Sequence, residues 1–254
     1  MTEFNFLNWQ AIDGVGTLTL NRPPLNVINI AVLGEMSAAF EQAASETAMR
    51  ALVVRAEGKM FSAGVDVADH TADKVGAMIP LFDRVCVALA DFPVPTLAVV
   101  HGHALGGGCE LALCCDFIVA ADSANFGQPE IKLATVAPIA ALRLPGVVGY
   151  RRAAELLFLG DTVNAVEAAR IGLINRAVPA NELDRIVDQY VSKLRSLSAP
   201  ALRVCKRAIR LGTEGRSNLP AIEKLYLDEL MSTEDAHEGV NSFIEKRAPV
   251  WKHI

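Results

Sequence analysis

The chain has 254 residues, of which 52% are hydrophobic and 21% are charged, and this composition excludes an intrinsically disordered protein. Lys and Arg total 24 against 29 Asp and Glu, so the net charge of −5 disfavours a dedicated nucleic-acid binder. No apolar run reaches the roughly 20 residues of a membrane-spanning helix, and the N-terminal segment lacks the basic and apolar regions of a signal peptide. We therefore expect a cytoplasmic protein. Its apolar excess favours burial of surface against further copies of the chain.

The cysteines do not follow a pattern typical of disulfides or zinc sites. Their number is odd and no two of them form a CxxC pair. We expect all five to be small buried hydrophobes in a reducing compartment. They are Cys86, Cys109, Cys114, Cys115 and Cys205.

The first half of the chain alternates strand-like and helix-like patterns. Short apolar runs predict strands at 15–20, 51–55, 96–100 and 117–120. Apolar residues at helical spacing predict helices at 30–46, at 74–91 and directly after the glycines 106–108. Strands separated by helical crossovers indicate an α/β fold with mainly parallel pairing.

From about residue 150 onward, strand signals nearly vanish and helical patterns dominate. Helices are predicted at 151–159, 165–171, 181–197, 200–211, 219–231 and 235–246. A composition shift near residue 190 suggests a core over 1–190 and a helical C-terminal subdomain over 191–254.

Two turns rich in small residues follow predicted strands. Gly106, Gly107 and Gly108 precede an apolar helix, where glycine lets a backbone N–H approach a ligand closely and the helix N-terminus favours an anion or an oxyanion. A tight strand-to-helix turn would explain the same glycines. The turn 61–66 (FSAGVD) is similar, and the two turns together could aim one N–H each at a single oxygen, as in an oxyanion hole.

Two glutamates accompany these turns. Glu110 lies in the first turn of the triglycine helix, and Glu130 follows small and apolar residues. Burial raises the pKa of a carboxyl group and lets it act as an acid or base near neutrality. For either residue alone, a carboxylate interacting with a helix dipole is the favoured explanation.

Taken together, these residues resemble the crotonase superfamily, the enoyl-CoA hydratases and isomerases. The similar stretches are 59–67 (KMFSAGVDV), 98–133 (AVVHGHALGGGCELALCCDFIVAADSANFGQPEIKL), 143–179 and 238–252, so the resemblance covers essentially the whole chain. It implies a crotonase, or ClpP-like, spiral of strand–strand–helix turns with a helical C-terminal region that trimerises, often as a dimer of trimers. It also implies an acyl-CoA thioester as substrate, no metal, and no cofactor other than the coenzyme A of the substrate.

The resemblance assigns roles to individual residues. The thioester oxygen would lie between the N–H groups of Ala63 and Gly107, where donors stabilise an enolate. Glu110 would activate water for attack on the β-carbon, and Glu130 would deliver a proton to the α-carbon. Further positions that align with substrate and coenzyme A contacts are Leu25, Val27, Lys59, Ser62, Asp66 and Gly106. Phe243 and Lys252 align with positions that reach coenzyme A from a neighbouring subunit.

One segment departs from the family pattern. Typical members read approximately LGxxPGAGGTQRL after the second glutamate, whereas this chain has LATVAPIAALRL at 133–144. Pro138 has no N–H to donate to a bound water, and Ile139 adds bulk, so a loop at 134–142 should give the acyl pocket a different shape. This variant segment, PPLNVIN at 23–29 and FSAGVDVADHTADKV at 61–75 resemble the cyclic dienoyl-CoA hydratases. Those enzymes hydrate cyclohexa-1,5-diene-1-carbonyl-CoA in anaerobic benzoyl-CoA degradation.

Several alternatives stay open at this point. The enzyme could be a straight-chain enoyl-CoA hydratase of fatty-acid β-oxidation, or a Δ-enoyl-CoA isomerase, which needs only one carboxylate. An RNA-binding homologue is disfavoured by the acidic charge balance, and a non-catalytic homologue by both glutamates being present. His70 either lies near the pocket mouth or is an exposed loop residue. His101 and His103 share one face of a strand end, but a metal would need more ligands than Asp116 could add.

Overall fold

The centre of the protein is a six-stranded sheet, seen in a computed structural model that describes residues 4–254. Residues 1–3, which belong to the N-terminal segment considered above for a signal peptide, lie outside that range. The strand order is β1 (Leu7–Ile12), β2 (Val15–Leu20), β3 (Ala51–Ala56), β4 (Thr96–Val100), β6 (Phe117–Ala121) and β9 (Arg176–Val178). β1 pairs with β2 antiparallel, and every later pair in this sheet is parallel.

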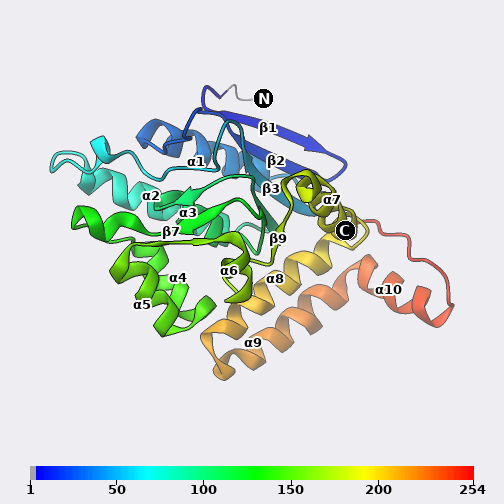
Figure 1. The fold of residues 1–254 in the computed structure, drawn as a ribbon. Helices are drawn as coiled ribbons and strands as arrows, with labels where there is room; N and C mark the ends of the chain where they lie inside the picture. The colour runs from blue at the N-terminus through cyan, green and yellow to red at the C-terminus, as the bar shows by residue number, and fades with distance from the viewer. Residues whose placement is uncertain (1–3) are drawn as a thin grey trace.

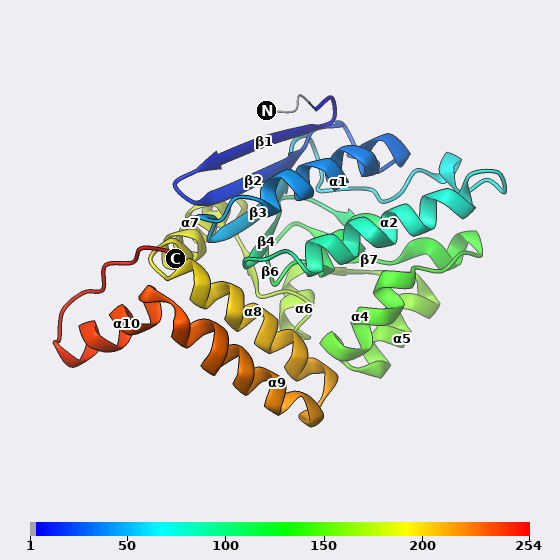
Figure 2. The same cartoon turned by 180° about the vertical axis from the view of Figure 1, so that it is seen from behind.

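Alternation along the central strands gives the sheet two apolar faces. Val54 and Ala98 belong to the larger core, which is shared with α1 (Ile30–Ala44), α2 (Val75–Ala90) and α3 (Gly107–Leu113). The neighbouring residues Val53 and Leu97 point to the opposite face. There they pack with side chains of α7 (Leu183–Arg195). Figure 2 shows α1 and α2 in front of the sheet. Because both faces are covered, these strands read as continuous apolar runs.

The chain winds between this sheet and a smaller one. β4 leads into β5 (Ala104–Leu105) and then α3, while β6 leads into β7 (Asn125–Gly127). β7 is followed by the 3-10 turn η2 (Pro129–Leu133), α4 (Pro138–Val148) and α5 (Tyr150–Leu159). β5 and β7 join β8 (Thr162–Asn164) in a three-stranded sheet, and α6 (Ala165–Arg170) precedes β9. These repeated strand–strand–helix turns confirm the predicted α/β spiral, and the same edge of both sheets carries the turns of interest.

The C-terminal helices extend away from the sheets (Figure 1). α8 (Ala199–Glu214) is followed by α9 (Leu219–Lys224), which continues through η5 (Leu225–Glu229) and η6 (Leu230–Ser232) to α10 (Glu234–Ile244). The predicted division at residue 190 falls inside α7, which packs on the sheet. Packing therefore favours a boundary after α7 rather than within it.

Most predicted elements agree with the structure to within a few residues, but the shortest ones were missed. β5, β7, β8 and β9 have two or three residues each, too few to show a period. β1 was missed because it is an edge strand whose side chains are mostly exposed, so its apolar pattern is weak. The structure has the helix α4 where the comparison with the glycine-rich family pattern predicts a loop.

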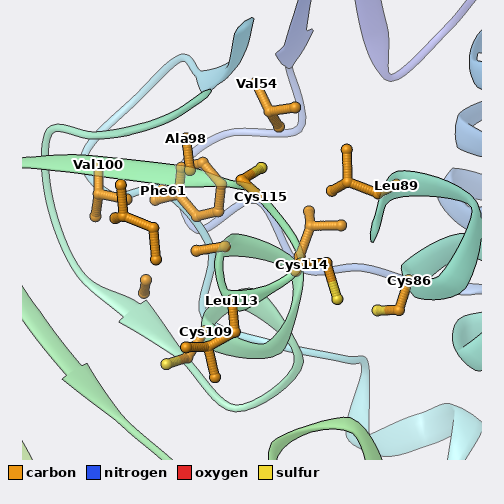
Figure 3. Close-up of a cluster of buried hydrophobic side chains, with 14 of the residues drawn as sticks. Val54, Phe61, Cys86, Leu89, Ala98, Val100, Cys109, Leu113, Cys114 and Cys115 are labelled. Carbon is orange, nitrogen blue, oxygen red and sulfur yellow. The ribbon is translucent and has the colours of Figure 1, made fainter. Parts of the chain in front are cut away.

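The cysteines were predicted correctly with one exception. Cys86, Cys109, Cys114 and Cys115 are buried, and their side chains lie among apolar residues of the core in Figure 3. Cys205, on α8, is exposed, contrary to the prediction, because its side chain borders a solvent-open groove between α8 and the spiral. All five thiols are free.

Within residues 4–254, none of the helices has the length and apolar character needed to cross a membrane.

Candidate active site

A cavity of about 270 Å³ lies where the turn after β3, the glycine turn before α3, the 3-10 turn η2 and the start of α4 meet. Its walls are largely apolar, and they include Val65, Met78, Ile79, Phe82, Leu133, Val136 and Pro138. Four titratable side chains also line it, namely His70, Glu110, Glu130 and Lys132. An apolar cavity with a few converging polar groups is the usual form of a small-molecule site.

The glycine turn supplies a free backbone donor to this cavity. Gly106 has φ 53° and donates its N–H to Gly127 O at 2.9 Å, which fixes the start of α3 at Gly107. As the first residue of that helix, Gly107 has an N–H with no acceptor among the described residues. A Cβ on Gly107 would lie 2.6 Å from Val65 Cγ2. Glycine is therefore needed here for the two turns to approach each other.

The second donor is not the one that the family resemblance implied. The N–H of Ala63 donates to Leu25 O at 2.9 Å, so it is already used. Gly64 O accepts the N–H of Ile28, and the N–H of Asp66 donates to Ile28 O. Val65 lies between these two bonds, so its own N–H points away from Ile28 and has no acceptor within residues 4–254. Ala63 still lines the cavity, but the geometry corrects the donor to Val65.

Gly64 brings the two free N–H groups together. Its φ of +105° belongs to the region that favours glycine, and a Cβ there would stand 3.3 Å from Gly107 N and 2.9 Å from Leu105 O. Val65 and Gly107 therefore lie on either side of a close backbone contact. Two converging N–H donors in a water-poor cavity can stabilise negative charge on one oxygen.

Glu110 projects from the first turn of α3 and is only 3% exposed. Its Oε1 accepts the N–H of Ala140 at 2.9 Å. Burial raises the pKa of Glu110 to about 8, helped by the charge of Glu130 and opposed by the N–H groups of Ala140 and Ile139. The carboxyl group can thus gain or lose a proton near neutrality.

Glu130 reaches the same cavity from η2. A Cβ on Gly106 would stand 2.7 Å from Glu130 Oε1, so this carboxyl group lies directly against the glycine turn. Its Oε2 is buried and has no hydrogen-bond partner among the described residues. Burial raises the pKa of Glu130, while the charge of His70 lowers it. The structure therefore brings both predicted glutamates to one cavity, and one carboxyl oxygen of Glu130 is free for a ligand.

The segment predicted as a loop at 134–142 is corrected by the structure. Pro138 is the first residue of α4, a position where proline is favoured because the N–H would be unpaired in any case. The next N–H groups of this helix, those of Ile139 and Ala140, bind Glu110. Pro138 lines the cavity, but Ile139 does not, since its side chain is buried in the core.

Other predicted contact residues lie outside this cavity. Ser62 is fully buried, with its hydroxyl donating to Asn26 O at 2.8 Å and accepting the N–H of Gly64 at 3.1 Å, so it shapes the turn instead of facing a ligand. Asp66 caps a 3-10 turn by accepting the N–H of Ala68. The remaining predicted positions, which line no part of the cavity, are Leu25, Val27, Lys59, Phe243 and Lys252. Their contacts with coenzyme A stay predictions, whereas Gly106 does line the cavity.

The three histidines of this edge differ in position. His70 lies in the cavity wall, which decides between the two alternatives for it. His101 Nε2 lies 3.1 Å from Gly58 O, and His103 Nδ1 lies 3.2 Å from Asn125 Nδ2. Asp116 instead pairs with Lys206 at 2.7 Å. Over residues 4–254, no three His, Cys, Asp or Glu side chains are grouped as a metal would require.

Comparison with known proteins agrees with this fold and site. The family model described as enoyl-CoA hydratase/isomerase matches residues 10–253. A probable enoyl-CoA hydratase of Mycobacterium bovis is 39% identical over 246 residues, covering 94% of this chain and 95% of its own. A cyclohexa-1,5-dienecarbonyl-CoA hydratase of Thauera aromatica is 37% identical over 250 residues, covering 96% of each chain.

The fold comparison leads to the same family. A crystal structure of an enoyl-CoA hydratase from Geobacillus kaustophilus superposes with a TM-score of 0.94 at 30% identity, covering 100% of this chain and 98% of the other. A spiral with two free N–H donors and two cavity carboxyls defines a crotonase-type site. The chain belongs to the enoyl-CoA hydratase/isomerase family.

Proposed function

We propose that this enzyme is a hydro-lyase that adds water to an α,β-unsaturated acyl-CoA thioester. The observation that carries the proposal is the arrangement of two carboxyl groups with raised pKa values, Glu110 and Glu130, in one cavity beside two free N–H groups. The thioester oxygen would accept hydrogen bonds from Val65 and Gly107. These fixed donors stabilise the enolate that forms when the β-carbon is attacked, by about 3–4 kcal/mol for each such donor.

Each of the two carboxyl groups carries out one of the two proton transfers. Ala140 holds Oε1 of Glu110, so the other oxygen of this carboxylate can accept a proton from water as its hydroxyl bonds to the β-carbon. Glu130, with a free Oε2, delivers the proton to the α-carbon. No metal and no cofactor enters these steps, because the coenzyme A arrives as part of the substrate.

We further propose a cyclic acyl group, that of cyclohexa-1,5-diene-1-carbonyl-CoA, and a role in anaerobic aromatic degradation. The Thauera aromatica relative is named for this substrate. The cavity is consistent with a flat ring, since Phe82, Val136 and Pro138 provide rigid apolar walls. A straight-chain substrate is the alternative, because the similarly close Mycobacterium bovis relative is named only as a probable enoyl-CoA hydratase. An isomerase would need one carboxyl group, and this cavity holds two.

We also propose that the enzyme works in the cytoplasm as a trimer or a dimer of trimers. The C-terminal helices leave large apolar side chains exposed, including Leu227 at 62% and Phe243 at 85%, and such surface favours association. Lys252 pairs with Glu234 in its own chain. Phe243 and Lys252 would complete the coenzyme A site of a neighbouring subunit.

A substrate panel tests the proposed activity. Crotonyl-CoA would be compared with cyclic monoenoyl-CoA and cyclic dienoyl-CoA, following the loss of the conjugated thioester absorbance. We expect the dienoyl ester to be favoured at least about ten-fold, since a poorly filled apolar pocket loses roughly 1–3 kcal/mol per missing group. A preference for crotonyl-CoA would leave only the straight-chain activity. Hydration of none of these esters would contradict the proposed function itself.

A further inference from the structure

His70 is held rigidly in the wall of the active-site cavity. It ends the 3-10 turn η1 (Val67–Asp69), and its backbone N–H donates to Val67 O at 3.0 Å. Its ring Nδ1 lies 3.0 Å from Asp66 O. The backbone of Asp66 is itself fixed, since its N–H donates to Ile28 O at 2.9 Å. The imidazole therefore has a fixed orientation although it is partly exposed to solvent.

The contact with Asp66 determines which ring nitrogen can exchange a proton. A carbonyl oxygen only accepts hydrogen bonds, so Nδ1 of His70 must carry a hydrogen. In the neutral ring, Nε2 is then the free acceptor, and no partner for it is found within residues 4–254. Nε2 is therefore the ring nitrogen that can exchange a proton with a group in the cavity.

The group that shares the cavity with this ring is Glu130. Both side chains line the same space. Burial raises the pKa of Glu130, and the charge of His70 makes a smaller, opposite contribution. Glu130 Oε2 has no partner among the described residues. A carboxyl oxygen and an imidazole nitrogen, each without a protein partner, are thus found in one cavity of about 270 Å³.

The proposed hydration requires a group that can return a proton to Glu130. Each turnover leaves Glu110 with the proton taken from water and Glu130 without the proton given to the substrate. Glu110 is 3% exposed, so direct exchange with solvent is restricted at that end. Before the next turnover, a proton must leave Glu110 and another must reach Glu130.

We propose that His70 is a positioning residue that returns the proton to Glu130 after each turnover. The Nε2–H bond of the imidazolium breaks, an O–H bond forms on Glu130, and the neutral ring then takes a proton from solvent at the cavity mouth. No electrons are transferred, and the proton released from Glu110 balances the proton taken up by His70. This role rests on the proposed hydratase activity and adds a third side chain to it.

Charged residues come close to His70 in the cavity lining and in the chain. Glu130 and Lys132 come from η2, and Glu110 comes from α3. The turn around His70 contributes Asp66 and Asp69, and the residues before α2 contribute Asp73 and Lys74. Lys74 Nζ lies 3.3 Å from Asp69 Oδ1, so these two charges largely offset each other. Glu130 is therefore the acidic group in the cavity that is free to respond to His70.

The test separates the first turnover from later ones. In a stopped-flow mixing of enzyme with excess dienoyl-CoA, or with the enoyl-CoA that the panel favours, His70→Asn should give a first turnover within about two-fold of wild type. The reason is that Glu130 has had time to take up its proton before mixing. The following steady phase should be at least about ten-fold slower, in line with the usual contribution of a positioned proton donor. Added imidazole should accelerate the steady phase of the variant and leave wild type unchanged.

Matched variants make the outcome decisive. Asn can still donate to Asp66 O, which preserves the turn, and His70→Gln provides a second variant with an amide nearer the Nε2 position. His103→Gln changes an exposed histidine of a neighbouring loop. In this variant the steady phase should be as fast as in wild type, and added imidazole should not accelerate it. A steady rate equal to wild type, or an equal fall of both phases without rescue, would overturn the role of His70. If wild type itself hydrates no enoyl-CoA, the proposed function fails instead.

Discussion

The large sheet of the spiral and the C-terminal helices differ in how far their apolar residues are covered. In the spiral, Leu33 and Leu52 are 0% exposed, and both faces of the large sheet are covered. In the C-terminal region, α9 has no buried residue, and Tyr226 and Leu227 are 53% and 62% exposed. The large sheet of the spiral thus has a core completed within one chain. Large apolar side chains stay exposed on the C-terminal helices and also on α4 and α5, where Leu142 and Phe158 are 75% and 68% exposed.

A few buried contacts join the two regions. Lys206 of α8 is 6% exposed, and its Nζ lies 2.7 Å from Asp116 Oδ2 and 3.1 Å from Val94 O. All groups that line the cavity belong to the spiral. The C-terminal helices contribute no residue to the cavity lining, and the assembly proposed above would cover their exposed apolar side chains.

Removal of the C-terminal residues from about 235 onward should have the largest effect. Two contacts hold the residues that follow α10. The N–H of Lys252 donates to Asp235, which is 2% exposed, at 2.7 Å, and the Trp251 indole donates to Ser196 O at 2.8 Å. We expect aggregation or dissociation and loss of activity, measured by light scattering coupled to size exclusion and by the hydration assay.

A full-length variant separates assembly from folding. Tyr226→Lys combined with Leu227→Lys should lower the oligomeric state, whereas Ile12→Lys, at a position 63% exposed in the spiral, should not. An active and well-behaved monomer after the truncation would contradict the proposal that the enzyme needs a trimer-based assembly for activity.

Changing the two carboxyl groups should come next in size. Glu110→Gln and Glu130→Gln should each lower kcat about 10³-fold or more, with acyl-CoA affinity largely kept, because each carboxyl acts mainly in the transition state. Steady-state kinetics and calorimetric binding would measure the two effects separately. Glu41→Gln, an exposed change on α1, is the control. Either variant keeping more than about a tenth of the wild-type turnover would contradict its assigned role.

A change at the cavity wall should alter specificity more modestly. Pro138→Gly loosens the start of α4 and restores an N–H there, so it should lower the ratio of cyclic dienoyl-CoA to crotonyl-CoA turnover by roughly five- to ten-fold. The ratio of the two kcat/KM values is the measurement. Pro145→Ala changes the exposed proline within the same helix and should leave the ratio as it is. A ratio unchanged by Pro138→Gly would remove Pro138 from the determinants of specificity.

The residues that sequence reasoning placed correctly depend on local chemistry. Gly107, Glu110 and the helix that contains them follow from a glycine run and an apolar period within about ten residues. The exact oxyanion donor does not, because the choice between Ala63 and Val65 is made by the pairing of Ile28 with the turn. That contact joins segments far apart in the chain, and no local pattern encodes it.

The prediction for the start of α4 was wrong for a different reason. Pro138 could have been read as a first helical residue, but comparison with a glycine-rich family pattern favoured a loop. The consequence is physical, since the N–H of Ala140 binds Glu110 only because a helix begins here. His70 required the tertiary structure, since the cavity that it lines is formed with residues far away in the chain, such as Glu110 and Glu130.

The last expected effect concerns stability instead of activity and follows from the buried carboxyl group of Glu110. Its pKa is raised from the ordinary 4.5 to about 8, so the unfolded chain loses this proton well before the folded one. Between these two values the folded state holds more protons, and stability therefore falls as the pH rises. The loss is on the order of 1 kcal/mol per pH unit and levels off above the folded pKa.

Glu110→Gln should remove this dependence, because an amide does not titrate and can still accept the N–H of Ala140. The gain in stability of the variant over wild type should grow from pH 6 to pH 8 and stay constant above about pH 9. In melting experiments this corresponds to about 2–4 °C for each kcal/mol. Glu130→Gln should show the same sign, because burial raises that pKa as well. Melting curves of wild type and Glu110→Gln that shift in parallel over this range would mean that Glu110 is already ionised in the folded protein.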